Sequence, residues 1–305
     1  MFKGVRKWAY IFIVPFFIGY FVFQLFPNLY SFYISLMEWS GIGEMKFIGL
    51  KNYITLFTTD PYFIKSLLNT AAIIVTSIPL TIILGLIVAV MLFDEKFRGR
   101  RFFQLSNFLP YIVTPVAVGL IFNYMFDWKA GIINKLLINL GILKDGIDWL
   151  GGDLFFTRFI LVLLLVWQNF GYFMIMYLAG LSSISPEIYE AAKVDGSSKI
   201  NTFFKITLPL LKPVTLFVVI ISIIGGMQLF DQPYLLMMGT ARGLAGTAGG
   251  PNRTLLTVMW NFYDTAFGPR MNYGLGAAIT YTLFIFIVGF SYVGIRIFKG
   301  RDKEL

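Results

Sequence analysis

The chain is built from long, uninterrupted apolar runs separated by shorter polar segments. Six runs reach the roughly 20 mainly apolar residues that a helix needs to cross about 30 Å of hydrocarbon. They cover residues 8–34, 67–93, 103–126, 157–181, 208–238 and 271–298. Because each run is continuously apolar, without strict alternation, the pattern predicts helices and not the strands of a barrel. We therefore expect an all-α integral membrane protein of about six transmembrane helices, with residues 1–305 forming a single transmembrane domain.

The first apolar run raises the question of a signal peptide, because Lys3, Arg6 and Lys7 precede it. A cleaved signal peptide has an apolar region of roughly 7–15 residues that ends in small residues. The run here is longer, is rich in Phe and Ile, and ends at Pro27. We expect it to be retained as the first span.

Composition supports a lipid environment and excludes several kinds of chemistry. The 305 residues are 57% hydrophobic and 13% charged, whereas soluble domains carry roughly 25% charged residues. The chain has no cysteine and no histidine, which excludes disulfides and thiol nucleophiles and removes the usual general base and metal ligand. The net charge of +9 is spread over short loops that flank apolar runs, which does not favour a nucleic-acid partner.

Lysine and arginine placement predicts the orientation in the membrane. With six spans, both termini share a side with the second and fourth connections, and that side carries more Lys and Arg. The termini and the loop 182–207 are therefore expected in the cytoplasm. On the other side, segment 127–156 has apolar residues at helical spacing against Asn134 and Asn139, which predicts a short interfacial helix.

The loop 182–207 holds the most informative polar stretch. Pro186 suits the first position of a helix and Gly196 can take the left-handed conformation that ends one. We expect a short helix over roughly 186–195, with Ala191 and Ala192 offering a flat surface for close approach by another protein. From these residues alone, an ordinary capped loop remains an alternative.

The spacing of this loop resembles a known signature. Glu190-Ala191-Ala192, three residues, Gly196, nine residues, then Ile206 and Leu208-Pro209 are similar to the loop of permease subunits in binding-protein-dependent ABC importers. The wider run, LSSISPEIYEAAKVDGSSKINTFFKITLPLLKP, resembles the carbohydrate-uptake branch of that family. Further segments such as FLPYIVTPVAVGLIFNYMF and VWQNFGYFMIMYLAGL extend the resemblance to the maltose and glycerol-phosphate permeases over nearly the whole chain.

The resemblance implies a division of labour in a prokaryotic inner membrane. Two permease subunits, here expected to be related but distinct, would form the path, and an extracytoplasmic binding protein would deliver the solute. Each loop helix would sit in a groove of one of two cytoplasmic ATPase subunits. The chain has no Gly-x-x-x-x-Gly-Lys-[Ser/Thr] phosphate loop, so ATP and Mg²⁺ would be bound by the ATPase and this chain would need no cofactor. The coupling residues carried over are Glu190, Ala191, Ala192, Asp195, Gly196, Ile206, Leu208 and Pro209.

Polar residues at membrane depth are candidates for the solute path, because they are costly there and tend to face a water-filled cavity. Sugars bind to aromatic faces and to amide or carboxylate groups. The candidates are Trp167, Phe170 and Gly171 in the fourth span and Ser222, Gly226, Gln228 and Asp231 in the fifth. All except Asp231 fall at or near sugar-contacting positions by resemblance to the maltose permease. Hydrogen bonding or close packing between helices is the alternative for each of them.

Three other functions compete with sugar import. The same architecture could import glycerol phosphate, an amino acid or a polyamine, although the spans offer almost no Arg or Lys for an anion. An ion-coupled secondary transporter would need acidic relays and usually paired repeats, whereas Asp231 stands nearly alone. A membrane enzyme is least favoured, because no spaced nucleophile and base are found.

Overall fold

The computed structural model describes residues 2–94, 97–151, 153–238 and 247–300. They divide into two compact units. Unit 1 holds residues 1–64 and 262–284, and unit 2 holds residues 65–261 and 285–305.

Unit 1 contains the first long helix and a small cap that follows it. Its elements are α1 (Phe2–Tyr20), the π-helix η1 (Phe21–Leu25), α2 (Phe26–Ser35), β1 (Met37–Glu38), β2 (Lys46–Phe47) and α3 (Lys51–Thr58). The two short strands pair antiparallel, with Met37 opposite Phe47. The buried Asn52 amide donates to the main-chain oxygens of Ser35 and Met37, at 2.9 and 2.8 Å, which fixes α3 against the end of α2.

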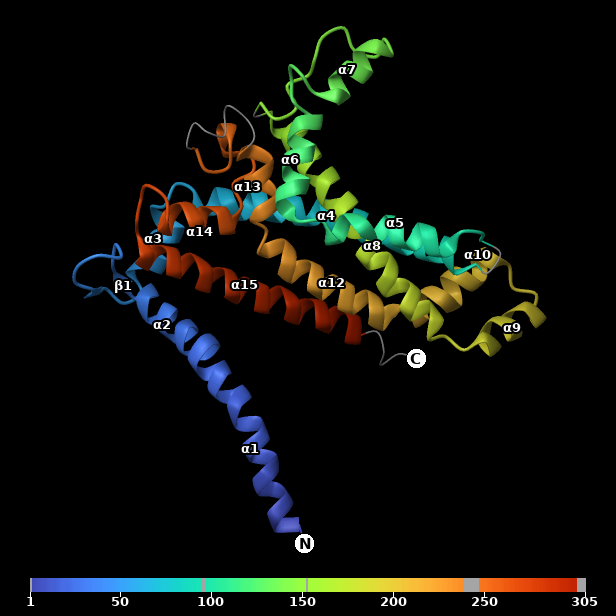
Figure 1. Ribbon diagram of the computed structural model, residues 1–305, viewed down its shortest axis with the longest axis horizontal. Helices are drawn as coiled ribbons and strands as arrows, with labels where there is room; N and C mark the ends of the chain where they lie inside the picture. Colours follow the sequence, from blue (N-terminus) through green and yellow to red (C-terminus); the bar gives the residue numbers. More distant parts are fainter. Residues whose placement is uncertain (1, 95–96, 152, 239–246, 301–305) are drawn as a thin grey trace. The chain divides into compact units, whose positions relative to one another are not determined.

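Unit 2 holds most of the remaining helices (Figure 1). They are α4 (Phe63–Phe93), α5 (Arg100–Ile112), α6 (Pro115–Met125), α7 (Ile132–Asn139), α8 (Leu154–Ser182), α9 (Pro186–Val194), α10 (Lys199–Thr202), the π-helix η2 (Phe203–Thr207), α11 (Leu208–Leu210), α12 (Lys212–Met227), α13 (Asp231–Met238) and the 3-10 helix η4 (Pro251–Arg253). Two further helices, α14 (Val258–Ala266) and α15 (Tyr273–Gly300), contribute residues to both units.

Four helices in the described residues are long and apolar enough to cross a membrane, or up to six if each of two bent pairs forms one span. The range 103–126, expected as one span, holds α5 and α6, which are bent by 95°. The break falls at Val113 and Thr114, whose backbones are extended. Thr114 precedes Pro115, and the residue before a proline is disfavoured in the helical region.

The range expected for the fifth span is also interrupted. In place of one helix over 208–238, the chain forms α11, α12 and α13, with Gln228–Phe230 between the last two. The segment Lys199–Leu210 is bent by 63° against α12. Non-helical backbone at membrane depth is tolerated where it is buried in protein or lines a cavity.

In unit 2, helix α8 packs against α4, α5, α12 and α13. Glycines mark two close crossings of α8: a Cβ on Gly180 of α8 would lie 2.8 Å from Val214 of α12, and one on Gly85 of α4 would lie 2.9 Å from Phe173 of α8. Near the C-terminal end of α8, Tyr177 and Leu181 are buried in an apolar cluster with residues of α4 and with Leu211.

Candidate functional site

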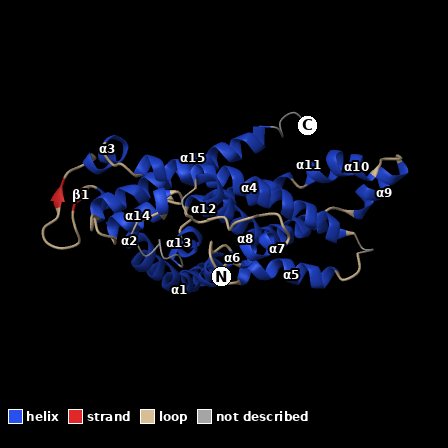
Figure 2. Cartoon of the chain, turned by 90° about the horizontal axis from the view of Figure 1, so that it is seen from above, coloured by secondary structure: helices blue, strands red, loops and turns tan. Residues whose placement is uncertain are grey.

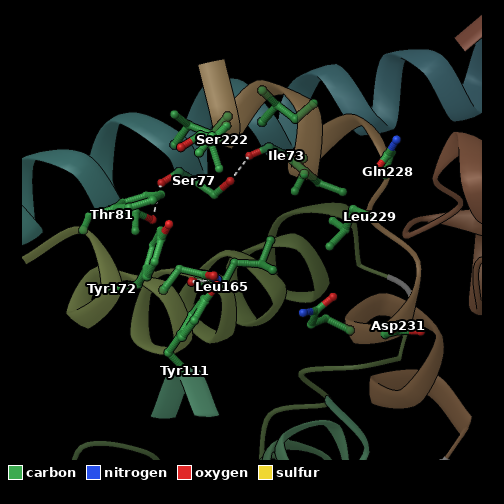
Figure 3. A pocket seen from close by; sticks show the side chains of 18 of the residues that line it. Ile73, Ser77, Thr81, Tyr111, Leu165, Tyr172, Ser222, Gln228, Leu229 and Asp231 are labelled. Atoms are coloured by element: carbon green, nitrogen blue, oxygen red, sulfur yellow. Dashed lines mark hydrogen bonds between the residues drawn. The ribbon is translucent and has the colours of Figure 1, made fainter. Parts of the chain in front are cut away.

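A cavity of about 310 Å³ lies among α4, α5, α8, α12 and the start of α13. All of its lining residues belong to unit 2. Figure 3 shows side chains from these elements facing a common space. The polar lining residues are Ser77, Thr81, Tyr111, Asn169, Tyr172, Ser222, Gln228, Asp231 and Gln232. The lining is therefore a mixture of hydroxyl, amide and aromatic groups, with one carboxylate.

One wall of the cavity is aromatic. The rings of Tyr111 on α5 and Tyr172 on α8 are stacked, with centroids 4.6 Å apart and an interplanar angle of 14°. Figure 3 shows both side chains at the same side of the cavity. A tyrosine pair combines a flat apolar face with phenolic hydroxyls that can donate or accept.

The small polar residues of the wall are already bonded to their own helices. Ser222 Oγ donates to the main-chain oxygen of Val218 at 2.6 Å, and Ser77 Oγ to that of Ile73 at 2.7 Å. Asn169 Nδ2 donates to the main-chain oxygen of Leu165 at 2.8 Å. Each of these side chains keeps an oxygen that can accept a hydrogen bond, so this wall favours a solute rich in hydroxyl donors.

The break between α12 and α13 supplies the remaining polar groups. Gln228 lies in the break, and Asp231 lies in the first turn of α13, where the helix dipole favours a negative charge. Gln232 Nε2 donates to Oε1 of the buried Gln168 on α8 at 3.1 Å. Among the residues that the structure describes, the lining contains no lysine or arginine.

The structure places the sequence candidates for the solute path in two groups. Ser222, Gly226, Gln228 and Asp231 line the cavity. Trp167, Phe170 and Gly171 are not among the lining residues, although they lie on the same helix as Asn169 and Tyr172.

The three candidates that do not line the cavity contact neighbouring helices. The Trp167 ring lies 5.5 Å from that of Phe122 on α6. Phe170 is partly buried, and its main-chain oxygen lies 3.0 Å from where a Cβ on Gly85 would be. A Cβ on Gly171 would overlap the main-chain oxygen of Asn107. Gly171 therefore provides close packing.

Sequence reasoning did not single out Tyr111 and Tyr172 as cavity residues. Leu165, Asn169, Tyr172 and Phe173 follow one another at spacings of four, three and one, which is a single face of α8. This helical spacing was the available signal for Tyr172. No sequence signal marked Tyr111, because its contact with α8 depends on how α5 packs.

The loop 182–207 forms the helix that its sequence predicts, over Pro186–Val194. Ser185 occupies the N-cap position without a side-chain capping bond. At the other end Gly196 has φ +72°, and its N–H donates to the oxygen of Lys193 while that of Ser197 donates to Ala192. These two bonds form a Schellman motif, which ends the helix and turns the chain.

The expectation that Ala191 and Ala192 form one flat docking surface is wrong for Ala192. Ala192 is buried, whereas Ala191, Glu190 and Asp195 are exposed. Tyr189 and Ala192, three positions apart on one side of α9, are the two residues of this helix that are not exposed, and Ala191 points about 100° away from Ala192. The outward face of α9 instead carries Glu190 and Val194, which is 87% exposed.

The remaining loop residues connect α9 to the membrane helices. Ile206 and Leu208 are partly buried and Pro209 is exposed, within η2 and α11. Leu211, directly after α11, is fully buried in the cluster at the end of α8. Figures 1 and 2 both show α9 and α10 at one end of unit 2, away from α6 and α13.

No group of three or more histidine, cysteine, aspartate or glutamate side chains that could hold a metal ion occurs in the described part of the chain.

Residues 81–296 match the family described as binding-protein-dependent transport system inner membrane component. Among curated relatives, the lactose transport system permease protein of Rhizobium radiobacter is 34% identical over 97% of this chain and 95% of its own length. The arabinooligosaccharides transport system permease protein of Bacillus subtilis is 31% identical over 99% and 92%. The trehalose/maltose transport system permease protein of Thermococcus litoralis is 29% identical over 97% and 95%.

The fold is also similar to that of a solved transporter. A chain in the crystal structure of a bacterial alginate ABC transporter, in complex with alginate pentasaccharide-bound periplasmic protein, matches with a TM-score of 0.81. The match covers 96% of this chain and 95% of that chain at 20% identity. The likeness establishes the all-α importer permease fold.

Proposed function

This chain belongs to the family of binding-protein-dependent transport system inner membrane components, and on that basis we propose that it forms half of the translocation path for a neutral carbohydrate. As a member of that family it is a multi-pass transport subunit of the inner membrane and not an enzyme, and ATP is bound by a partner ATPase. The observation that carries the sugar assignment is the lining of the cavity beside α8.

Three features of the cavity support a carbohydrate. The stacked Tyr111 and Tyr172 rings offer an apolar face, and the amides of Asn169, Gln228 and Gln232 offer donors and acceptors for hydroxyls. The described lining residues include no Lys or Arg, which disfavours glycerol phosphate. A polyamine would call for several carboxylates, and Asp231 is the one carboxylate among the described lining residues. Relatives named for lactose, arabinooligosaccharide and trehalose/maltose transport support the same class.

We further propose that α9 is the helix through which two cytoplasmic ATPase subunits, one on each permease, drive the cycle. Its exposed face carries Glu190, Ala191 and Val194. A force on α9 would pass through η2 and α11 to Leu211, which is packed against Leu181 and Tyr177 of α8. Tyr177 Oη also donates to Thr215 Oγ1 of α12 at 3.2 Å, so that α8 and α12 move with the loop as packed bodies.

The complete importer would then contain this subunit, a second and related permease subunit, two ATPases and an extracytoplasmic binding protein that delivers the sugar. Both termini and α9 would lie in the cytoplasm, in agreement with the excess of Lys and Arg on that side.

Reconstitution of this chain with its permease, ATPase and binding-protein partners in liposomes tests the proposal. Uptake of radiolabelled lactose, arabinooligosaccharide or maltose is expected to require ATP. Tyr172→Ala should reduce uptake more than Tyr172→Phe, which keeps the ring face. Uptake by this chain alone, driven by a proton gradient without ATP, would instead establish a secondary transporter.

A further inference from the structure

Helices α6 and α13 form a packed pair. A Cβ on Gly119 of α6 would lie 2.7 Å from Cβ of Leu235 on α13, so the two backbones approach as closely as a glycine allows. The buried amide of Asn123 donates to the main-chain oxygen of Leu236 at 2.8 Å. Separating the two helices would leave this amide unsatisfied, which is costly away from water. The pair therefore moves as one body.

Breaks in the backbone separate this pair from the helices that precede each member. Val113 and Thr114 lie between α5 and α6, and Gln228–Phe230 lie between α12 and α13. On the near side of the first break, α5 is held against α8 by the contact of Gly171 with Asn107. The backbone changes of a swing of the α6–α13 pair would fall at these two breaks, the second of which is also held by the bond from Thr257 Oγ1 to the main-chain oxygen of Leu229 at 2.7 Å.

Two side-chain contacts join the pair to α8. The ring of Phe122 on α6 lies against that of Trp167. On α13, Gln232 Nε2 donates to Gln168 Oε1 at 3.1 Å, and Gln168 is 4% exposed. The second contact differs from the first because Gln232 also lines the cavity. The Gln232 amide is therefore within reach of a solute, and a solute that turns this amide away from Gln168 breaks its bond to α8.

We propose that Gln168 and Gln232 form a latch that holds the α6–α13 pair on α8, and that a solute hydroxyl in the cavity releases it by competing for Gln232. This inference rests on the proposed import function. Gln232 acts as a positioning residue, through α13, in addition to any contact with the solute. Interhelical hydrogen bonds within bilayers are weak enough that losing one shifts a two-state population by about three- to tenfold. One replacement bond from a solute can therefore supply the difference.

Spin-label distances on the full-length permease in nanodiscs test the latch. Because the chain has no cysteine, Phe159→Cys on α8 and Met238→Cys on α13 provide two labelling sites, both of which are exposed. Gln232→Leu is expected to raise the population with the longer distance about three- to tenfold. Gln168→Leu should do the same, and the double variant should have no larger effect than either single one. The matched control is Asn169→Leu, in the same cavity, whose amide donates within α8 and which should keep the starting distribution.

The latch is refuted if Gln232→Leu leaves the distance distribution of the starting protein unchanged, if Asn169→Leu shifts it equally, or if the effects of the Gln168 and Gln232 variants add. These distances are measured on the permease without partners or solute. A failure of the same protein to support ATP-dependent uptake with its partners would instead count against the proposed function.

Discussion

Gly171 on α8 meets the main-chain oxygen of Asn107 on α5 so closely that a methyl group at position 171 would overlap it. The contact brings Tyr111, one turn beyond Asn107, into its stack with Tyr172. The aromatic wall of the cavity therefore depends on a glycine that does not line it.

This contact predicts opposite effects of alanine at two helical glycines. Gly171→Ala should destabilise the protein, by about 1–3 kcal/mol, because overpacking forces helices apart. Gly289→Ala on α15 is the matched control, since a Cβ there has no heavy atom within 4 Å. It should stabilise by up to about 1 kcal/mol, because alanine is the better helix former. Thermal unfolding of the detergent-solubilised protein measures both, and equal shifts would contradict the packing role.

Substitutions of Gly196, at the end of α9, should weaken the coupling of ATP turnover to the loaded binding protein to different degrees. Its φ is +72°. This left-handed conformation costs an L-residue roughly 1–2 kcal/mol, and costs asparagine less. Proline cannot adopt it, because its ring fixes φ at a negative value. A Cβ at this position meets nothing within 4 Å, so sterics beyond the backbone do not contribute. ATP turnover stimulated by the loaded binding protein should fall in the order Gly196→Asn, Gly196→Ala, Gly196→Pro. Full coupling in Gly196→Pro would exclude a role for this turn.

The hydrogen bonds of Asn134 hold the segment around α7 together, and we expect their loss to unfold this segment locally. The buried amide donates to the main-chain oxygen of Ile147 at 2.9 Å and accepts from Trp149 Nε1 at 2.8 Å. Asn134→Leu leaves these partners unsatisfied, at a cost of about 1–3 kcal/mol each. Limited proteolysis should then cut within 127–151 faster than in the starting protein. The exposed Asn139 on the same helix offers Asn139→Leu as a control that should not change the cleavage rate.

Substitutions of Asp231 distinguish sugar import from ion-coupled transport. A sugar hydroxyl can donate to an amide oxygen as well as to a carboxylate, so Asp231→Asn should keep ATP-driven uptake within about tenfold of the starting protein. Asp231→Leu should reduce uptake further, because it removes the acceptor. If uptake depended on proton binding at this residue, Asp231→Asn would abolish it. Initial uptake rates in liposomes, measured with and without a pH gradient, decide between these outcomes.

Sequence pattern was sufficient for the class of protein and for the helix within the loop 182–207. The length and continuity of the apolar runs indicate membrane helices, because hydrocarbon imposes both on any segment that crosses it. Pro186 and Gly196 likewise mark the two ends of α9, since proline and glycine act on the backbone of their own position. These are local properties, which is why they could be read from the chain.

Tertiary packing decided everything that depends on which face of a helix meets which neighbour. It buried Ala192, turned Gly171 into a contact with α5, and placed Tyr111 beside Tyr172. Polar residues at membrane depth can face a cavity or another helix, and their cost in lipid is relieved equally by both. The sequence could therefore identify such residues in a span, but only the crossing of α5, α8 and α12 determined which of them line the cavity.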